Sequence, residues 1–435
     1  MRIVKIKRTG KLVGNLKLPG DKSISHRAAI LAALAEGRSE IRNFSSSSDC
    51  NSTLRCIELL GAKVGREGDR IFIDGCGPRG LREPASALDC GNSGTTMRLL
   101  AGALAGQLFT SVLFGDESLN RRPMRRIIEP LERMGATIKA ASGNPPLEIS
   151  GRRPLSTIEY APPIASAQVK SAILLAGLFA SGKTTVIESV PTRDHTERML
   201  PIFGAQIEEV AQEHGRRISV LGGGLRAASL CVPADISSAA FFLVGAACLP
   251  GSEVYVEKVG LNPTRTAVLD VLEASGVKIS VEARRIDAGE PVGDLRVFGG
   301  LETTCNVGPV KLKGSIIANL IDEVPILAVF GTQLPDGIEI REAGELRYKE
   351  SDRIDAVCKG LRAMGATVDE FDEGLRVYRS NLVGGRVDAR GDHRIAMAFS
   401  IAALLAEGET TIDGAESVAV SFPNFFDCLR KLSYP

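Results

Sequence analysis

One apolar helical pattern recurs six times along the chain. Each copy is rich in Ala and Leu, and most copies are followed by a glycine and a β-branched stretch. The copies begin about 70–80 residues apart, at Ser25, Ser93, Ser166, Ser237, Ile317 and His393. Because these runs are apolar on all sides, each predicts a helix buried within its lobe. Regular repetition of this kind is typical of a fold built from one repeated unit.

A second, more amphipathic helical pattern lies between these copies. Leu, Ile and Met recur at positions i, i+3 and i+4, and a glycine near the end caps the helix before a strand. Clear copies occupy residues 52–64, 125–138, 265–279 and 352–368, with weaker ones at 193–207 and 422–432. Six units of helix–strand–helix–strand account for nearly the whole chain. They predict an α/β fold of two lobes with three units each, and a proline before a helix cap near Asp235 marks a candidate linker.

The size of the chain agrees with two lobes. A length of 435 residues is too great for one ordinary core, and 44% of the residues are hydrophobic, enough to fill two. No apolar run approaches the ~20 residues that a membrane helix needs. The basic N-terminus, residues 1–10, lacks the apolar stretch of a secretory signal. We therefore expect a cytoplasmic protein that does not enter a membrane.

Cysteine, histidine and net charge exclude several other classes. The nine cysteines show no C-x-x-C spacing, and the four histidines form no ligand cluster. We therefore expect buried free thiols in a reducing compartment, and no metal site. The net charge of +1 argues against a nucleic-acid partner, because nucleic-acid binding usually needs a clear basic excess. Any anion site must be built from a local concentration of charge.

The segment 177–184 matches the P-loop pattern G-x-x-x-x-G-K-T in full. A P-loop needs a strand before its glycines and a helix after them, so that the helix N-terminus meets the phosphate. Here an apolar helical run precedes the glycines, and a β-branched stretch, residues 184–190, follows them. Because the order is reversed, we interpret Gly182 as a helix C-cap and expect no nucleotide site.

Cationic residues gather where the predicted helices begin. Helix N-termini present free N–H groups and a positive dipole end, which favour anions. Lys22 and Arg27 fall at the mouth of the first buried helix, and Gly94 would let a ligand approach the backbone at the second. Other residues at such ends are Ser166, Ala167, Gln168, Arg394, Arg122, Arg193, Lys349 and Arg353. A solvated first turn with ordinary capping serines would explain any one motif. Repetition at equivalent ends predicts a substrate with phosphates or carboxylates, which Arg binds bidentately and Lys as a point charge.

Two carboxylates differ from ordinary surface charge. Asp322 lies in an apolar helical run, residues 318–330, where an unneeded charge would be costly. Glu350 stands between Lys349 and Arg353. Each has a plainer interpretation: Asp322 as a helix-end carboxylate paired with a nearby arginine, and Glu350 as a surface partner of Arg353.

Seven motifs agree in order and spacing with one family. The most specific are LPGDKSISHR from Leu18, GNSGTTMRLLAG from Gly91 and RYKESDRI from Arg347. The others are RRP from Arg121, SAQ from Ser166, RDHTERM from Arg193 and DHRIAMAFS from Asp392. Along essentially its whole length, the chain resembles the 5-enolpyruvylshikimate-3-phosphate synthases.

This resemblance implies a fold and a reaction. The fold would be a two-lobed inverse α/β barrel of six βαβαββ-type units around buried helices. Residues 1–18 and 234–435 would form one lobe and residues 19–233 the other, with the active site in the cleft between them. The enolpyruvyl group of phosphoenolpyruvate would pass to the 5-hydroxyl of shikimate 3-phosphate, through a tetrahedral intermediate that loses phosphate. This step of aromatic amino acid biosynthesis would need no metal and no organic cofactor, and a monomer is the family's usual state.

The resemblance also assigns residues to each substrate, position by position. Shikimate 3-phosphate would be bound by Lys22, Ser23, Arg27, Ser166, Ala167, Gln168, Arg193, Asp322 and Lys349. Phosphoenolpyruvate would be bound by Lys22, Gly94, Arg122, Gln168, Arg353 and Arg394. Asp322 would be the base for the hydroxyl. Lys22 and Glu350 are both candidates for moving the C3 proton.

Two positions depart from the pattern of some members. Val420 stands where those members have a lysine before the C-terminal T-F-P, and Glu345 stands near their asparagine upstream of K-E. One phosphate contact is therefore missing or supplied elsewhere. Both features resemble the branch that includes many Gram-positive bacterial enzymes. Gly94 favours binding of the herbicide glyphosate, whereas Val420 argues against assuming it.

Two rival functions lie close to this interpretation. The sister enzyme that uses UDP-N-acetylglucosamine shares the six-unit fold, but it typically has a cysteine on the loop before the R-P motif. Residues 115–120 form that loop here and contain no cysteine. A non-catalytic repeat scaffold would not need Lys and Arg at the mouths of buried helices. We therefore favour the shikimate 3-phosphate enzyme.

Overall fold

The computed structural model describes residues 2–77, 79–301 and 308–433, which fall into two units. We call the unit formed by Met1–Pro19, Ala234–Arg285 and Pro291–Pro435 the terminal unit. We call the unit formed by Gly20–Pro233 and Ile286–Glu290 the inserted unit. Each unit has its own contiguous apolar core. Among the described residues the strands form six sheets, three in each unit.

The sheets of the inserted unit follow one plan. A parallel pair of strands encloses a buried helix in sequence, and an antiparallel hairpin then completes the sheet, as in the orders β6-β7-β9-β8 and β10-β11-β13-β12. The third sheet, β14-β3-β5-β4, takes its parallel partners for β3 from the far end of the unit, at β14 and β15. The strands are β3 (Ala35–Arg42), β4 (Lys63–Glu67), β5 (Arg70–Cys76), β6 (Leu88–Asp89), β7 (Thr110–Phe114), β8 (Thr137–Ala141), β9 (Asn144–Ser150), β10 (Glu159–Tyr160), β11 (Lys183–Glu188), β12 (Ile207–Ala211), β13 (Arg216–Leu221), β14 (Leu225–Arg226) and β15 (Ser229–Cys231).

The terminal unit repeats this plan with strands from both ends of the chain. Its sheets have the orders β17-β18-β16-β2, β19-β20-β22-β21 and β1-β24-β23. The N-terminal strand β2 pairs in parallel with β16, and β1 pairs antiparallel with β24. The strands are β1 (Ile3–Lys7), β2 (Val13–Leu16), β16 (Glu253–Gly260), β17 (Lys278–Asp287), β18 (Glu290–Phe298), β19 (Val310–Leu312), β20 (Ile338–Ile340), β21 (Val368–Phe371), β22 (Gly374–Val377), β23 (Arg386–Asp388) and β24 (Glu409–Asp413). The strand–helix–strand–helix–hairpin order is the predicted βαβαββ unit.

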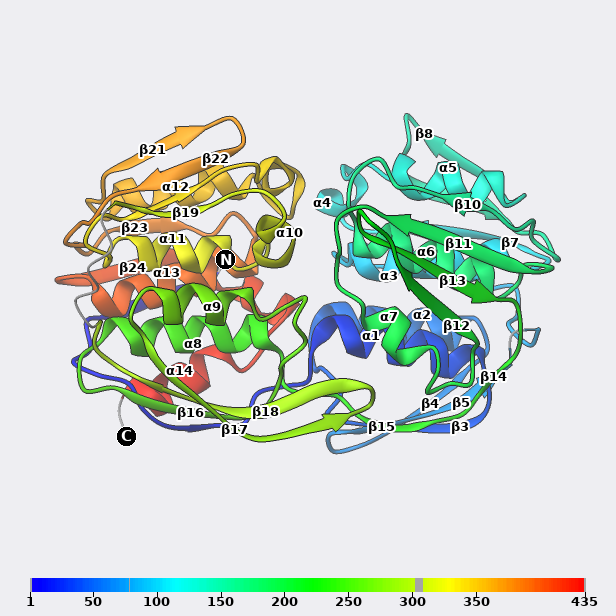
Figure 1. Cartoon of the computed structure of the whole chain (residues 1–435), viewed down its shortest axis with the longest axis horizontal. Coiled ribbons are helices and arrows are strands. Elements are labelled where there is room, and N and C mark those ends of the chain that lie inside the picture. Colours follow the sequence, from blue (N-terminus) through cyan, green and yellow to red (C-terminus); the bar gives the residue numbers. More distant parts are fainter. Residues whose placement is uncertain (1, 78, 302–307, 434–435) are drawn as a thin grey trace. The chain divides into compact units, whose positions relative to one another are not determined.

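Helices fill the inside of each unit, and sheets lie outside them (Figure 1). The buried helices are α1 (Lys22–Leu34), α3 (Gly94–Ala105), α6 (Ala167–Gly177), α8 (Ile236–Cys248), α11 (Val324–Gly331) and α13 (His393–Leu405). In α8 every residue except Cys248 is buried, as expected for a run that is apolar on all sides. The other helices are α2 (Ser48–Leu59), α4 (Glu117–Asn120), α5 (Arg125–Arg133), α7 (His195–Met199), α9 (Ala267–Ala274), α10 (Ile316–Leu320), α12 (Arg353–Ala363) and α14 (Phe425–Ser433), with the 3₁₀ turns η1 (Gly344–Tyr348) and η2 (Ala415–Val420).

The prediction of one continuous helix in the fifth repeat is wrong. The run divides into α10 and α11, and Asp322 lies in the turn between them rather than within a helix. Pro325 stands at the start of α11. A proline has no N–H, and its ring clashes with the carbonyl four residues before it, so it is favoured in the first turn of a helix and disfavoured further inside one.

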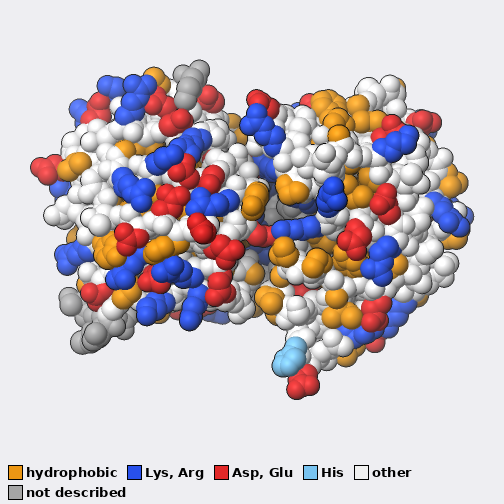
Figure 2. All heavy atoms as spheres, turned by 90° about the horizontal axis from the view of Figure 1, so that it is seen from above, with side chains coloured by type: hydrophobic (Ala, Val, Ile, Leu, Met, Phe, Trp, Pro, Cys, Tyr) orange, Lys and Arg blue, Asp and Glu red, His pale blue; other side chains and the backbone are white. Residues whose placement is uncertain are grey.

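Three other expectations concern features other than the repeat itself. In segment 177–184, Gly177 ends α6 and Lys183 begins β11, so helix and strand follow the order opposite to that of a P-loop. The interpretation of Gly182 as the helix C-cap is wrong, because Leu178 is the C-cap and Gly182 lies in the loop before β11. Eight cysteines are free thiols, while Cys305 lies outside the described residues. None of the helices that the structure describes is both long and apolar enough to cross a membrane. Lys and Arg side chains are interspersed with Asp and Glu on the face of each unit in Figure 2, in keeping with the net charge of +1.

Candidate active site

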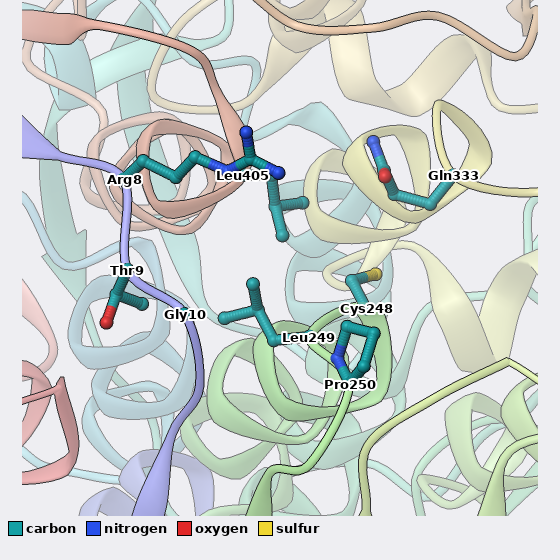
Figure 3. A pocket seen from close by; sticks show the side chains of 8 residues that line it. All are labelled: Arg8, Thr9, Gly10, Cys248, Leu249, Pro250, Gln333 and Leu405. Carbon is teal, nitrogen blue, oxygen red and sulfur yellow. The ribbon is translucent and has the colours of Figure 1, made fainter.

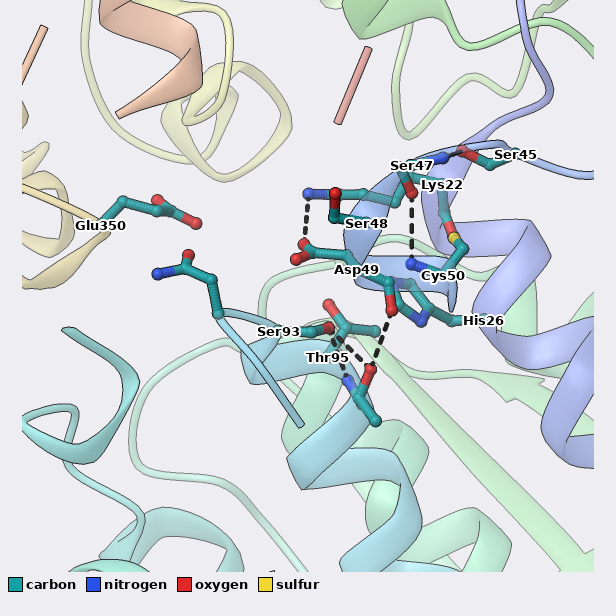
Figure 4. A network of polar contacts seen from close by, with 12 residues as sticks. Lys22, His26, Ser45, Ser47, Ser48, Asp49, Cys50, Ser93, Thr95 and Glu350 are labelled. Carbon is teal, nitrogen blue, oxygen red and sulfur yellow. Dashed lines mark hydrogen bonds and ion pairs between the residues drawn. The ribbon is translucent and has the colours of Figure 1, made fainter. Parts of the chain in front are cut away.

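Lys22 is the first residue of α1 in the inserted unit. Its ammonium lies 3.0 Å from the Oδ2 atom of Asp49, whose side chain is almost fully buried in the first turn of α2 (Figure 4). Asp21 caps the helix by accepting a hydrogen bond from the backbone of Ile24 at 2.9 Å. The predicted residue Ser23 follows Lys22, so both stand at the positive end of the helix. Asp49 was not predicted, because its run of serines looks like an ordinary helix cap.

Arg27 lies one turn further along α1 and is buried. Its guanidinium donates to the hydroxyl oxygens of Thr196 (2.7 Å) and Ser171 (2.8 Å) and to the carbonyl of Ser23 (2.9 Å). Burial lowers the pKa of Arg27 to about 10, and the positive charge of Arg193 adds to the lowering. Arg27 therefore remains charged at neutral pH beside a second guanidinium. Two neighbouring cations of this kind favour a bound anion.

A chain of buried hydroxyl groups joins the beginnings of three helices. The Nδ1 atom of His26 lies 2.7 Å from the hydroxyl of Thr53, which lies 2.7 Å from that of Thr96. Thr96 in turn donates to the hydroxyl of Ser93, the N-cap of α3, at 2.8 Å. Burial is the largest cause that lowers the pKa of His26, and Lys22 contributes further. The neutral His26 ring thus ties α1 to α2 and α3 without adding charge.

Two arginines lie against the first residue of α3. A Cβ atom placed on Gly94 would come within 2.8 Å of the Nη1 atom of Arg98 and 3.4 Å of that of Arg122. Asn92 holds Arg122 through a hydrogen bond of 3.0 Å. Glycine therefore keeps the helix N-terminus open where two guanidinium groups converge, a geometry suited to an anion. Arg98 lies in the motif GNSGTTMRLLAG but was not predicted as a site residue. Its position four residues after Gly94 puts both on one face of the helix and could have indicated its role.

Gln168 connects this arginine pair to α6. Its side-chain oxygen accepts from Arg98 Nη1 at 2.5 Å, and its amide nitrogen donates to the hydroxyl of Thr95 at 2.9 Å. Ser166 caps α6 by accepting from the backbone of Val169, with Ala167 between the cap and Gln168. Gly94 of α3 and Gln168 of α6, both predicted site residues, are therefore connected through Arg98, which was not predicted.

The terminal unit contains the second group of predicted residues. Asp322 lies 3.3 Å from Arg353 Nη1, 3.6 Å from Arg394 Nη2 and 3.9 Å from the ammonium of Lys349, while its carbonyl accepts from Arg394 at 2.9 Å. Glu350 lies 2.6 Å from Arg353 Nη2. The plainer interpretations are thus right about the partners of both carboxylates. The interpretation of Glu350 as a surface residue is wrong, because its side chain is 12% exposed and that of its partner Arg353 is 1% exposed.

Arg353 holds three carboxylates in this group. Its Nε atom lies 2.8 Å from Asp392, the N-cap of α13, in addition to its contacts with Asp322 and Glu350. Burial alone would lower the pKa of Arg353, but Asp392, Glu350 and Asp322 outweigh it and raise the pKa. Burial lowers the pKa of Lys349, and Asp322 opposes the change. The result is a set of interleaved positive and negative groups.

A cavity of about 420 Å³ lies elsewhere in the terminal unit (Figure 3). Its lining residues are Arg8, Thr9, Gly10, Cys248, Leu249, Pro250, Gln333 and Leu405. Cys248 ends α8 and Leu405 ends α13. The cavity therefore sits at the negative ends of these helices, which disfavour anions, and it contains none of the predicted site residues. Within the described residues, no group of three His, Cys, Asp or Glu side chains is placed to hold a metal ion.

Comparison with known proteins gives one consistent family. The model of the family described as EPSP synthase (3-phosphoshikimate 1-carboxyvinyltransferase) matches residues 6–429. A 3-phosphoshikimate 1-carboxyvinyltransferase of Koribacter versatilis is 50% identical over 435 residues, which cover 99% of each chain. One of Salinibacter ruber is 49% identical over 434 residues, covering 98% of this chain and 99% of the relative. A solved EPSP synthase from Acinetobacter baumannii aligns with a TM-score of 0.85 at 41% identity, over 99% of this chain and 98% of that one.

Proposed function

Because the chain belongs to the EPSP synthase family, we infer that it transfers the enolpyruvyl group of phosphoenolpyruvate to shikimate 3-phosphate. It is therefore a transferase of the shikimate pathway and takes part in aromatic amino acid biosynthesis. The observation that best supports this activity is the pair of Arg98 and Arg122 beside Gly94 at the start of α3. A helix N-terminus beside two guanidiniums suits a substrate with both a phosphate and a carboxylate.

We propose that shikimate 3-phosphate binds to the residues that begin α1, α6 and α7. The proposed set in the inserted unit is Lys22, Ser23, Arg27, Ser166, Ala167, Gln168 and Arg193, joined by Asp322 and Lys349 of the terminal unit. The neighbouring charges of Arg27 and Arg193 support the assignment, since a phosphate would relieve their repulsion.

We propose a second set for phosphoenolpyruvate. It comprises Lys22, Gly94, Arg122, Gln168, Arg353 and Arg394. The open helix end at Gly94 supports this set, and so does the hydrogen bond that fixes Arg122 to Asn92. Arg98 belongs with this set on the same grounds, because it lies closer to Gly94 than Arg122 does.

The proposed chemistry has two steps. In the addition, the 5-hydroxyl oxygen bonds to C2 of phosphoenolpyruvate, Asp322 takes the hydroxyl proton, and Lys22 or Glu350 gives a proton to C3. In the elimination, the bond from C2 to the phosphate oxygen breaks, phosphate leaves, and a C3 proton returns to Lys22 or Glu350. Positioned proton transfers of this kind each accelerate a reaction by about 10²–10⁴-fold.

The activity is tested by measuring phosphate release. The purified protein should release phosphate only when both substrates are present, and not when UDP-N-acetylglucosamine replaces shikimate 3-phosphate. Release that continues unchanged after shikimate 3-phosphate is omitted would overturn the assignment.

The role of Asp322 is tested by Asp322→Ala. Arg353 keeps Glu350 and Asp392 as partners, so the cluster retains negative charge. We expect kcat to fall by about 10²–10⁴-fold, with a much smaller change in the affinity for shikimate 3-phosphate. Asp270→Ala, on the exposed face of α9, is the matched control and should change neither. Equal losses in turnover and affinity would make Asp322 a binding residue only.

We also propose that the protein is a cytoplasmic monomer. Light scattering on a gel-filtration column should then give a mass near 46.2 kDa. A mass near twice this value would contradict the monomer.

A further inference from the structure

A buried cluster of charged side chains lies one turn inside α6. The ammonium of Lys170 lies 2.8 Å from Glu188 and 2.7 Å from Glu197, and its side chain is only 1% exposed. Arg216 lies 2.8 Å from Glu188 and 3.3 Å from Glu197. Lys170, Glu188, Glu197 and Arg216 therefore form one network of ion pairs inside the inserted unit, and Arg216 also lies 2.9 Å from the more exposed Glu209. None of the four belongs to the proposed substrate sites.

Stability alone is a weak explanation for this cluster. Removing charges from water is costly, and apolar residues of similar volume often stabilise a fold as well as a buried ion pair does. Burial raises the pKa of Glu197 although Lys170 and Arg216 oppose the change, which is a sign of that cost. What a buried cluster does supply is fixed geometry, because each member is held by several directional bonds.

The cluster fixes the backbone immediately before Arg193. Glu188 accepts a hydrogen bond from the backbone N–H of Thr192 at 3.0 Å and another from its hydroxyl group. The carbonyl of Thr192 accepts from Arg216 at 3.2 Å and from Lys170 at 3.5 Å. Both polar groups of the Thr192 backbone are thus bound by the cluster, and the next residue along the chain is Arg193.

Helix α6 also contacts Arg27, the other arginine proposed to bind shikimate 3-phosphate. Ser171, next to Lys170 in α6, lies 2.6 Å from the hydroxyl of Thr196 in α7, and both hydroxyls accept from Arg27. Lys170 therefore joins the start of α6 to the segment that carries Arg193. Ser171 joins the same helix to Arg27.

We propose that Lys170 is a positioning residue that holds Arg193 at a fixed distance from the start of α6, and thereby determines the affinity for shikimate 3-phosphate. The proposal rests on the proposed function, since it takes Arg193, Ser166 and Gln168 as ligands of that substrate. Lys170 does not touch the substrate. It acts through the backbone of Thr192, so its loss should affect one substrate and leave the other almost unchanged.

The test uses a charge-balanced double variant. Lys170→Met alone would leave two buried carboxylates with one cation and could prevent folding. Lys170→Met with Glu197→Gln removes one positive and one negative charge, and leaves Arg216 paired with Glu188 and Glu209. We expect the KM for shikimate 3-phosphate to rise about tenfold or more, because small misplacements of a binding group carry effects of this size. The KM for phosphoenolpyruvate and kcat at saturation should change less than about twofold.

Three further variants separate the possible outcomes. Glu197→Gln alone removes the charge that Glu197 exerts on Arg27, so its KM values are the reference for the double variant. Lys183→Met with Glu208→Gln removes an exposed Lys–Glu pair from the same unit and should change neither KM. Arg193→Gln tests the proposed site itself and should raise the KM for shikimate 3-phosphate. If Arg193→Gln has no effect, the proposed site is wrong and this inference falls with it. Suppose that Arg193→Gln raises that KM. If the folded Lys170/Glu197 variant then leaves the KM for shikimate 3-phosphate unchanged, or raises the KM values for both substrates equally, only the positioning role is overturned.

Discussion

Replacing Gly94 with alanine tests the proposed phosphoenolpyruvate site with a single methyl group. The new Cβ would come within 2.8 Å of Arg98 Nη1 and 3.4 Å of Arg122 Nη1. Two heavy atoms at 2.8 Å without a hydrogen bond overlap, so the Arg98 guanidinium must move by several tenths of an ångström. The nearest atoms are the ends of flexible side chains, so the backbone of α3 can stay in place.

The size of the effect follows from what Arg98 holds. Its Nη1 atom is also the donor to Gln168 at 2.5 Å, so displacement weakens that bond together with the bond to a ligand. Hydrogen bonds to charged groups contribute about 1.5–3 kcal/mol. Losing one corresponds to about a ten- to hundredfold rise in the KM for phosphoenolpyruvate. The fold itself should not be weakened, because alanine is favoured over glycine in helices by up to about 1 kcal/mol.

Steady-state kinetics with each substrate varied in turn would measure this. The KM for phosphoenolpyruvate should rise more than the KM for shikimate 3-phosphate, since Gln168 belongs to both proposed sets, and the melting temperature should stay near the wild-type value. Gly65→Ala is the matched control, because its Cβ would find only an ordinary contact at 3.8 Å from Phe72 in the same unit. An unchanged KM for phosphoenolpyruvate in a Gly94→Ala variant would refute the placement of this substrate beside Gly94.

Three other predictions address the chemistry, the inhibitor and the core. Glu350→Gln should slow the exchange of C3 hydrogens of phosphoenolpyruvate with deuterated solvent by about 10²-fold or more; unchanged exchange would leave Lys22 as the group that moves the proton. Glyphosate should inhibit in competition with phosphoenolpyruvate, and inhibition that does not weaken as phosphoenolpyruvate increases would contradict this. Burial raises the pKa of Cys50 and of Cys358 to about 12. Since the unfolded thiols ionise near pH 9, their contribution to stability is complete below that pH and is lost as the pH rises towards 12. The melting temperature should therefore fall over this range, and less steeply in a variant with alanine at both positions; identical slopes would count against these pKa values.

The repeat was predictable because helix periodicity and burial leave a direct trace in the sequence. A run that is apolar on all sides, such as α8, can only be a buried helix in a chain of this kind. The division of the fifth helix was equally visible, since Pro325 stands within the apolar run. Strand pairing was harder to predict from the sequence. The partners of β3 come from residues 225–231, almost 200 residues later, and local sequence carries no signal for such a contact.

The site was predictable only where a residue type and its helix position were enough. Lys22, Gly94 and Arg394 stand at helix starts, where anions bind. Asp49, Arg98 and the cluster around Lys170 depend on contacts between helices and strands that are not adjacent in sequence. Spacing along one helix shows which face a residue occupies, but it does not show which side chain of a neighbouring helix meets it.

The partners of the cations explain how a chain with a net charge of +1 can offer sites for two anionic substrates. Arg27 is hydrogen-bonded to hydroxyl groups, Arg122 to the amide of Asn92, and Arg98 to the amide of Gln168. A hydroxyl or amide partner fixes a guanidinium in place and adds no charge of its own.

In the terminal unit the partners are carboxylates, as Arg353 shows with Asp322, Glu350 and Asp392. These cations hold in place the groups that the proposed reaction uses to move protons. Removing a neutral partner such as Asn92 should therefore weaken binding, whereas removing a carboxylate such as Asp322 should chiefly slow the reaction.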